Sequence, residues 1–248
     1  MSYERFAFLY DELMADAPYD QWVAFTKKKL ARFDVSGKRM LDLACGTGEL
    51  SVRFANEGFA VTGVDLSAEM LSVARKKAED CGLTIPLYQQ DMAELEGLGP
   101  FDFIVIYCDS LNYLADEKQV QKTLAGVFRF LKKGGVLLFD VHSIDKINNG
   151  FINQTFTLNE DHMAYIWNSF PGEFPYSVEH ELSFFVLDEE SGKYDRVDEL
   201  HIQRTFPIHA YSQWLKEAGF EIIEVNADFT ETAPQPESER IFFSALKK

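Results

Sequence analysis

The sequence predicts an α/β fold: a doubly wound, mostly parallel sheet of seven strands, with an antiparallel β insertion after the fifth strand. Short apolar runs alternate with amphipathic helical patterns from about residue 38 to residue 141. Such alternation is typical of βαβ units with right-handed crossovers and a parallel sheet. From 143 to about 205 the helical pattern stops and strand-like segments follow one another.

The N-terminal region is expected to be helical. Residues 3–33 carry apolar side chains such as Phe6, Leu9 and Leu13 at three- and four-residue spacings. Pro18 should divide this region into two helices, because proline is disfavoured inside a helix. Ser36-Gly37 then mark a turn before the first strand.

The following elements are read from periodicity and from turn residues. The first strand leads into a helix with Leu50 and Phe54 on one face, which should stop at Gly58. Ser67 is a plausible cap for the helix after the second strand, and Gly82 its stop. The second, third and fourth strands are expected at 59–65, 85–90 and 101–107.

A clear amphipathic helix precedes the fifth strand, because apolar residues recur between Val120 and Leu131 at i, i+4, i+7, i+8 and i+11. Gly134-Gly135 should end this helix, and 136–141 should form the strand. In the insertion, strands are expected at 164–167, 181–187 and 199–204, with a hairpin turn at Gly192. A helix near 211–218 and strands at 220–225 and 241–246 complete the chain.

The most informative segment runs from Met40 to Glu49, where an apolar strand meets a glycine-containing turn and then a helix. Gly46 and Gly48 lack a Cβ, so the backbone there can approach a ligand closely. Asp65, at the tip of the next strand, can accept both hydroxyls of a ribose. The unit is therefore a nucleotide-binding βαβ unit.

Two details decide between nucleotides. The third glycine of a dinucleotide fingerprint is replaced by Ser51, and Asp42 places a carboxylate at the end of the first strand. That carboxylate would repel a pyrophosphate but would suit an ammonium or a sulfonium. S-adenosylmethionine fits this pattern, and NAD fits less well.

The chain resembles the class I S-adenosylmethionine-dependent methyltransferases, in particular an uncharacterised bacterial subgroup. Five segments carry the resemblance in order over residues 38–141, with a weaker match at 214–220: Asp42-Leu-Ala-Cys-Gly-Thr-Gly48, Val64-Asp-Leu-Ser-Ala-Glu-Met70, Gln90-Asp-Met92, Phe101-Asp-Phe-Ile-Val-Ile106 and Leu131-Lys-Lys-Gly-Gly135. The resemblance implies a Rossmann-like fold closed by an antiparallel pair of strands, S-adenosylmethionine as cofactor, and methyltransferase activity.

The resemblance also assigns roles in cofactor binding. The backbone from Ala44 to Gly48 would line the methionine part, Asp65 would bind the ribose, Leu66 and Met92 would sandwich the adenine, and Asp91 would accept from its exocyclic amine. The alternatives are that Asp65 caps the next helix and that Leu66, Met70 and Met92 are ordinary core. The full candidate set is Asp42, Ala44, Cys45, Gly46, Thr47, Gly48, Asp65, Leu66, Asp91, Met92 and Cys108.

Methyl transfer by in-line displacement needs placement above all, and alignment alone can supply about 7–11 kcal/mol of the barrier. A general base helps only where the acceptor carries a proton. Candidate catalytic residues are Tyr10, Asp109 and His142. Tyr10 could face the sulfonium or pack its helix on the sheet, Asp109 could bind the cofactor's ammonium instead, and His142 could be a solvated loop histidine.

Aromatic side chains of the insertion are candidates for lining an acceptor pocket, although they could equally form the insertion's own small core: Tyr165, Trp167, Phe170, Phe174 and Tyr176. Cys45 is expected to be a small turn residue rather than a nucleophile.

Composition narrows the possible partners. The 40 acidic and 24 basic residues give a formal charge of −16, which disfavours nucleic-acid binding. The basic triplet Lys27–Lys29 is interpreted as a solvated helix face. Three cysteines without metal-ligand spacing indicate reduced thiols, a cytoplasmic location and no metal site. No signal peptide is expected, and no apolar run approaches the ~20 residues of a membrane span.

We therefore expect an N-terminal helical lid (1–35), a cofactor-binding core (36–142 and 207–248) and an inserted β subdomain (143–206), forming a monomer or homodimer. The expected function is methyl transfer to a small-molecule acceptor. The alternatives are methylation of a modified tRNA base, an NAD-dependent oxidoreductase, and a non-catalytic S-adenosylmethionine-binding regulatory protein. A cavity without room for an acceptor would favour the last.

Overall fold

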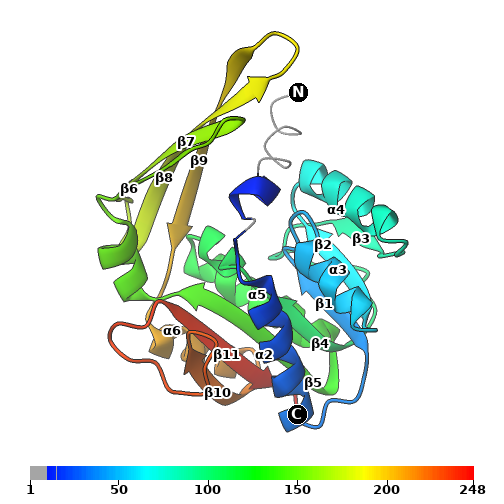
Figure 1. Cartoon of the computed structure of the whole chain (residues 1–248). Coiled ribbons are helices and arrows are strands. Elements are labelled where there is room, and N and C mark those ends of the chain that lie inside the picture. Colours follow the sequence, from blue (N-terminus) through cyan, green and yellow to red (C-terminus); the bar gives the residue numbers. More distant parts are fainter. Residues whose placement is uncertain (1–9, 15) are drawn as a thin grey trace.

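The computed structural model describes residues 10–14 and 16–248, and its core is a seven-stranded sheet in the order β10-β11-β5-β4-β1-β2-β3 (Figure 1). Neighbouring strands are parallel except where β11 pairs with β5 and β10. The predicted fold class is therefore confirmed. The strands are β1 (Arg39–Leu43), β2 (Ala60–Asp65), β3 (Leu87–Gln89), β4 (Phe101–Ile106), β5 (Leu131–His142), β10 (Glu221–Ala227) and β11 (Arg240–Leu246).

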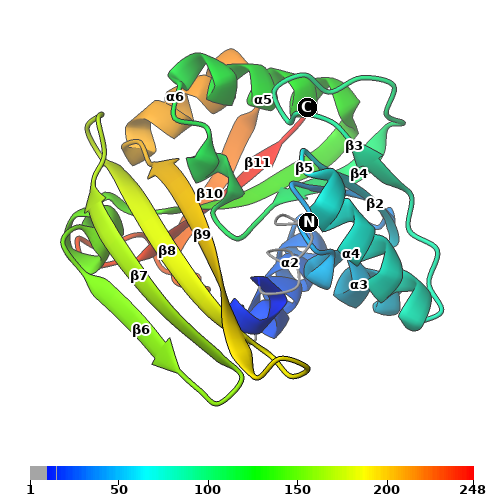
Figure 2. The ribbon, with the colours of Figure 1, turned by 90° about the horizontal axis from the view of Figure 1, so that it is seen from above.

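Helices cover both faces of this sheet, as the alternation along the strands requires (Figure 2). Phe103 and Val105 of β4 pack with side chains of α2 and α3, whereas Ile104 and Ile106 pack with those of α5 and α6. α4 lies beside α3 and β3. The helices are α2 (Tyr19–Arg32), α3 (Glu49–Asn56), α4 (Ala68–Asp80), α5 (Glu117–Phe130) and α6 (Ile208–Glu217).

The boundary between α5 and β5 differs from the prediction. The helix ends at Phe130, and Gly134-Gly135 lie within β5 rather than at the helix stop. Two hydrogen bonds to the C-terminus hold this glycine pair: Gly134 N–H donates to the Lys247 carbonyl (2.7 Å), and Lys247 N–H donates to the Gly135 carbonyl (2.9 Å). Pairing with Lys247, near the end of the chain, therefore makes this segment part of the strand.

The insertion forms a separate antiparallel sheet in the order β6-β7-β8-β9. β8 and β9 are joined by a hairpin in which Gly192 has a φ of +67°, as the turn prediction requires. The sequence did not indicate β6, the 3₁₀ turn η1 or the π-helical segment η2. The elements are η1 (Ser110–Tyr113), η2 (Lys146–Phe151), β6 (Thr155–Asn159), β7 (Met163–Pro171), β8 (Ser177–Asp188) and β9 (Lys193–Arg204).

The N-terminal segment lies between the inserted sheet and α4 (Figures 1 and 2). Residues 10–13 are helical, and Tyr10 and Leu13 pack with Met70 against Met163 and Leu182 of the insertion. The inserted sheet thus shares its apolar cluster with two other parts of the chain. The predicted helical positions Phe6 and Leu9 lie outside the described residues.

The two ends of the insertion are anchored at one point of the core. The buried Asn112 side chain accepts from His142 N–H (2.9 Å) and donates to the Arg204 carbonyl (2.9 Å). The Thr205 hydroxyl donates to the His142 carbonyl (2.6 Å). The backbone at the end of β5 is therefore fixed from both sides.

The basic triplet is only partly a solvated face. Lys27 and Lys28 have side chains 48% and 61% exposed, but Lys29 is fully buried. Lys29 shares a helix face with Trp22 and Thr26, and its ammonium contacts Glu224 and donates to Asn226 Oδ1 (2.7 Å) on β10. Helical periodicity, rather than charge, decides which lysine points inward.

No helix in the described part of the chain has the length and apolar character needed to cross a membrane.

The buried ion pair predicts unequal effects of two substitutions. Lys29→Met should lower the free energy of unfolding by about 3 kcal/mol, because removing one partner of a buried pair leaves the other without compensation. Arg32→Ala removes the second cation on Glu224, but Arg32 is 52% exposed, so the loss should be below about 1 kcal/mol. Urea unfolding of both variants measures the difference, and equal losses would contradict the assignment.

Candidate functional site

A cavity of about 1130 Å³ lies at the carboxyl ends of β1, β2, β4 and β5, bounded by the N-terminal segment and the inner face of the inserted sheet. Ligands of open α/β sheets bind at this edge. Seven of the predicted cofactor-binding residues line it, together with all three predicted catalytic residues: Ala44, Gly46, Asp65, Leu66, Asp91, Met92, Cys108, Tyr10, Asp109 and His142.

The turn after β1 is built from residues in the left-handed region. Ala44, Gly46 and Gly48 have φ values of 61°, 54° and 77°. A Cβ added at Gly46 would meet nothing within 4 Å, so this backbone is open to the cavity it lines. A Cβ at Gly48 would lie 2.9 Å from the Ala74 Cβ. Gly46 therefore leaves room for a ligand, whereas Gly48 allows the turn to approach α4.

Asp65 ties this turn to the end of β2. Its carboxylate accepts from Gly46 N–H (2.7 Å) and from Ser67 N–H (2.9 Å). Burial raises the pKa of Asp65, and these N–H donors oppose the rise. Ser67, rather than Asp65, caps α4, because the Ser67 hydroxyl accepts from Met70 N–H. The alternative that Asp65 serves as the cap of α4 is therefore not supported.

Asp42 lies behind the turn, outside the cavity lining, and is 2% exposed. Ser51 donates to its carboxylate (2.5 Å), so the residue at the position of the absent third glycine satisfies this buried group. Burial raises the pKa of Asp42 to about 6. Cys45, Thr47 and Gly48 also lie outside the lining, and burial raises the pKa of the Cys45 thiol well above its usual value.

Thr47 connects the turn to the N-terminal segment. Its hydroxyl donates to Asp11 Oδ1 (2.5 Å), and Asp11 Oδ2 lies 2.8 Å from Lys77 Nζ. Tyr10, Leu13 and Met14 line the cavity beside these contacts. The segment is thus fastened over the glycine turn, where a lid would have to lie.

The cavity also offers apolar surface beside Asp65. Leu66 is 66% exposed, and both Leu66 and Met92 line this cavity. Asp91 accepts from Ala93 N–H through one carboxylate oxygen (2.8 Å). An exposed leucine at a cavity wall offers free apolar surface to a flat ligand.

A cluster of buried charges lies beyond β4. Asp109 Oδ1 accepts from Arg240 Nη2 (3.0 Å), and Oδ2 accepts from Gln203 Nε2 (2.8 Å) and lies 3.2 Å from His142 Nε2. Burial alone would raise the pKa of Asp109, but the charges of His142 and Arg240 hold it well below its usual range. Asp109 is therefore ionised.

Arg240 also contacts the fully buried Asp140, which accepts from Trp22 Nε1–H (3.1 Å) and Asp109 N–H (3.2 Å). His142 is 6% exposed at the end of β5, so the alternative of a solvated loop histidine is wrong. The paired arrangement with Asp109 makes His142 a potential proton acceptor.

The inserted sheet supplies the remaining wall. Tyr165 and Trp167 line the cavity, whereas Phe170, Phe174 and Tyr176 lie outside it and are exposed. Sequence reasoning missed several lining residues, among them His180, Gln203 and Arg240. Strand alternation could have indicated the first, because His180 shares a face with Leu182 and Phe184; Arg240 carries no local signal.

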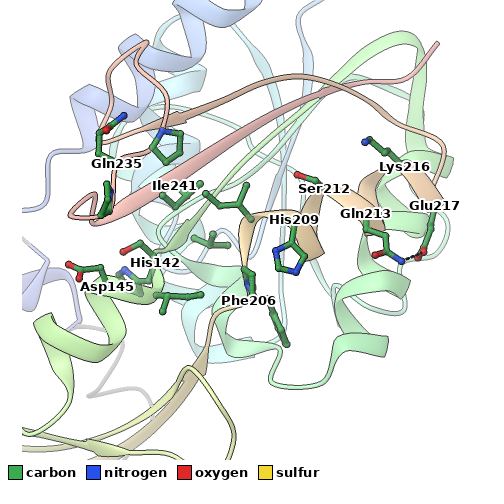
Figure 3. Close-up of a pocket in the computed structure, with 17 residues that line it drawn as sticks. His142, Asp145, Phe206, His209, Ser212, Gln213, Lys216, Glu217, Gln235 and Ile241 are labelled. Carbon is green, nitrogen blue, oxygen red and sulfur yellow. Dashed lines mark hydrogen bonds between the residues drawn. The ribbon is translucent and has the colours of Figure 1, made fainter.

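A second cavity of about 830 Å³ lies on the other side of His142, between α6, the end of β5 and the loop before β11 (Figure 3). His209 and Ser212 of α6 face His142 and Ile241 across it, and Gln213 donates to Glu217 (2.8 Å) at its rim. None of the glycine-turn residues lines this cavity, so the first cavity is the candidate cofactor site.

Comparisons with known proteins agree with this geometry. Residues 40–135 match the methyltransferase domain family. A candidate methyltransferase of Geobacillus sp. (strain WCH70) is 53% identical over 248 residues, 100% of both chains. The glycine/sarcosine N-methyltransferase of Halorhodospira halochloris is 31% identical over 78% of this chain and 69% of its own. The crystal structure of an S-adenosylmethionine-dependent methyltransferase from Clostridium acetobutylicum ATCC 824 covers 98% of both chains at 33% identity, with a TM-score of 0.89.

The buried Asp42 predicts a pH-dependent stability difference. Its pKa is about 6 in the folded chain against 3.8 ordinarily, so the folded state binds the additional proton and loses stability as pH rises through this interval. Asp42→Asn does not titrate there and can still accept from Ser51. The variant should gain about 2 kcal/mol relative to the parent between pH 4 and pH 7. Urea unfolding at pH 4, 5.5 and 7 tests this, and a constant difference would refute it.

Proposed function

This chain belongs to the class I S-adenosylmethionine-dependent methyltransferases, and we propose that it transfers the methyl group of S-adenosylmethionine to an amine nitrogen of a small molecule. S-adenosylmethionine is the cofactor of this family. One observation carries the proposal: a single cavity joins the glycine turn and Asp65 to the Asp109–His142 pair and to the inserted sheet.

The residues present fit the cofactor. Gly46 leaves open space where a side chain would intrude, Asp65 offers a carboxylate at the strand tip, and Leu66 and Met92 offer apolar surface for a flat base. When bound, S-adenosylmethionine supplies a methyl group on a positively charged sulfur. The ionised Asp109 and the other cavity carboxylates favour such a cation.

The cavity has room for a second molecule. Its volume of about 1130 Å³ exceeds the roughly 300–1,000 Å³ of most ligand pockets, and it continues past Asp109 to the inserted sheet. This room weighs against a purely regulatory cofactor-binding protein. The family membership excludes an NAD-dependent oxidoreductase.

The negative charge of the cavity lining supports an amine as the methyl acceptor. Five carboxylates line it against two basic side chains: Asp65, Asp91, Asp109, Asp228 and Glu239 against Lys146 and Arg240. Such a lining attracts cations and repels phosphates, in line with the net charge of −16. The relative at 31% identity is a glycine/sarcosine N-methyltransferase, and its acceptors are amines. Methylation of a tRNA base is therefore less well supported.

An amine that arrives as a cation must lose its proton before its nitrogen can accept a methyl group. We propose that the neutral form of His142 takes that proton on Nδ1, since Nε2 lies 3.2 Å from Asp109 Oδ2 and the carboxylate stabilises the imidazolium that results. Asn112 and Thr205 fix the backbone of His142, so its ring is presented from a rigid strand end. In this proposal Tyr10 closes the cavity from the N-terminal segment.

Cofactor binding is tested by two glycine variants. Gly46→Ala should weaken S-adenosylhomocysteine binding at least about tenfold, because its Cβ enters the open space, with a stability loss of about 1 kcal/mol. Gly48→Ala should cost more stability, about 2–4 kcal/mol, because its Cβ also meets Ala74. Calorimetric titration with S-adenosylmethionine, S-adenosylhomocysteine and NADH measures binding. Binding of NADH alone, or unchanged affinity in Gly46→Ala, would contradict the site.

Turnover is tested by following S-adenosylhomocysteine release with small amines, a catechol and bulk tRNA as acceptors. We expect turnover with amines, and a fall in kcat of about 10²-fold or more in His142→Gln. His162→Gln, an exposed histidine beside β7, is the matched control and should be unaffected. Preferential methylation of tRNA or of the catechol would replace the proposed acceptor class, and full activity of His142→Gln would remove the proposed base.

A further inference from the structure

His180, on β8 of the inserted sheet, is 3% exposed and lines the cavity. Phe151 and Trp167 hold its ring edge-on, with ring centroids 4.9 and 5.1 Å away and interplanar angles of 80° and 87°. The ring therefore has a fixed orientation.

The hydrogen bonds of Nδ1 determine the tautomer of this ring. Trp167 Nε1–H donates to His180 Nδ1 (2.9 Å), and an indole nitrogen can only donate. The Ser169 hydroxyl lies 2.8 Å from the same atom. Nδ1 therefore carries no proton, and in the neutral ring the proton is on Nε2.

The ring is neutral at physiological pH. Burial lowers the pKa of His180 to about 4, and the charges of His142 and His201 act in the same direction, whereas Gln203 and Asp109 oppose them. His180 thus presents an N–H group without a net charge.

Nε2 is buried and has no hydrogen-bond partner of standard geometry within the part of the chain that the structure describes. The Gln203 amide nitrogen donates to Asp109, and its amide oxygen faces His180 without completing a hydrogen bond of standard geometry. Buried donors are almost always satisfied, because an unpaired one is costly. A donor in the wall of a ligand cavity that makes no hydrogen bond of standard geometry is available to an acceptor atom of the ligand.

We propose that His180 Nε2–H recognises an uncharged oxygen, a hydroxyl or a carbonyl, on the molecule that is methylated. The inference rests on the proposed function and names the acceptor class: amines that also carry a neutral oxygen. The acidic excess of the cavity lining disfavours a carboxylate at this place. The rings of Phe151 and Trp167 beside His180 provide apolar surface for the carbon skeleton of such an acceptor.

The first test compares matched amines on the protein loaded with S-adenosylhomocysteine. Cyclohexylamine, 4-aminocyclohexanol and 4-aminocyclohexanecarboxylate differ only in the group opposite the amine. We expect 4-aminocyclohexanol to bind about tenfold tighter than cyclohexylamine and to shift the ¹⁵Nε2 resonance of His180. Equal affinities, no binding by any of the three, or tightest binding by the carboxylate would overturn the proposal.

Variants separate recognition from folding. His180→Phe should abolish the preference for 4-aminocyclohexanol over cyclohexylamine, and His180→Gln should retain part of it, because an amide can accept from Trp167 and still donate. His209→Phe, at an exposed position on α6, should retain all of it. A preference that survives in His180→Phe would refute the inference.

The tautomer of His180 can be measured without any variant or ligand. Long-range ¹H–¹⁵N spectra of the parent protein should show His180 protonated at Nε2, and protonation at Nδ1 would refute the inference directly. Calorimetry with S-adenosylhomocysteine distinguishes the two failures: without cofactor binding the proposed function fails, whereas binding without an oxygen preference removes only the role of His180.

Discussion

Two buried carboxylates, Asp109 and Asp140, share the guanidinium of Arg240, and the geometry of the site depends on this cluster. Its members come from the loop after β4, from β5 and from the first residue of β11, and Trp22 of α2 and Gln203 of β9 bond to it as well. Charges without water are tolerated only when they are paired and hydrogen-bonded. The closing strand, the N-terminal helix and the insertion must therefore meet in one arrangement, which fixes Asp109 beside His142.

The cluster also lies between two differently built parts of the cavity wall. On one side the glycine turn, Asp65 and Leu66 form a wall made by the core alone. On the other side His180, Trp167 and Tyr165 form a wall made by the insertion. Asp109 and His142 stand at the junction, where a methyl donor and its acceptor would have to meet. The proposed methyl transfer would then require little from the protein beyond exact placement and one proton acceptor.

Local patterns in the sequence predicted most of the elements and the core half of the site, because the turn, Asp65 and the helix periodicities depend on neighbours in the chain. They failed where distant pairing decides: Gly134-Gly135 continue β5 because they pair with Lys247, and Lys29 is buried because Glu224 and Asn226 lie opposite. Arg240 and Gln203 could not be assigned, since their partners Asp109 and Asp140 are about a hundred residues away in sequence.

The chain leaves the core at His142 and returns at Thr205, and these two residues are joined by a hydrogen bond of 2.6 Å. The inserted sheet is therefore attached to the core through one point, and insertions of this kind tolerate changes of length and sequence away from their anchors. The glycine turn, Asp65 and Leu66 lie in the core and outside such changes, whereas Gln203, which bonds to Asp109, has to be kept. Under the proposed function, a change of acceptor would therefore need changes within one contiguous stretch of sequence, while the residues around the glycine turn stay the same.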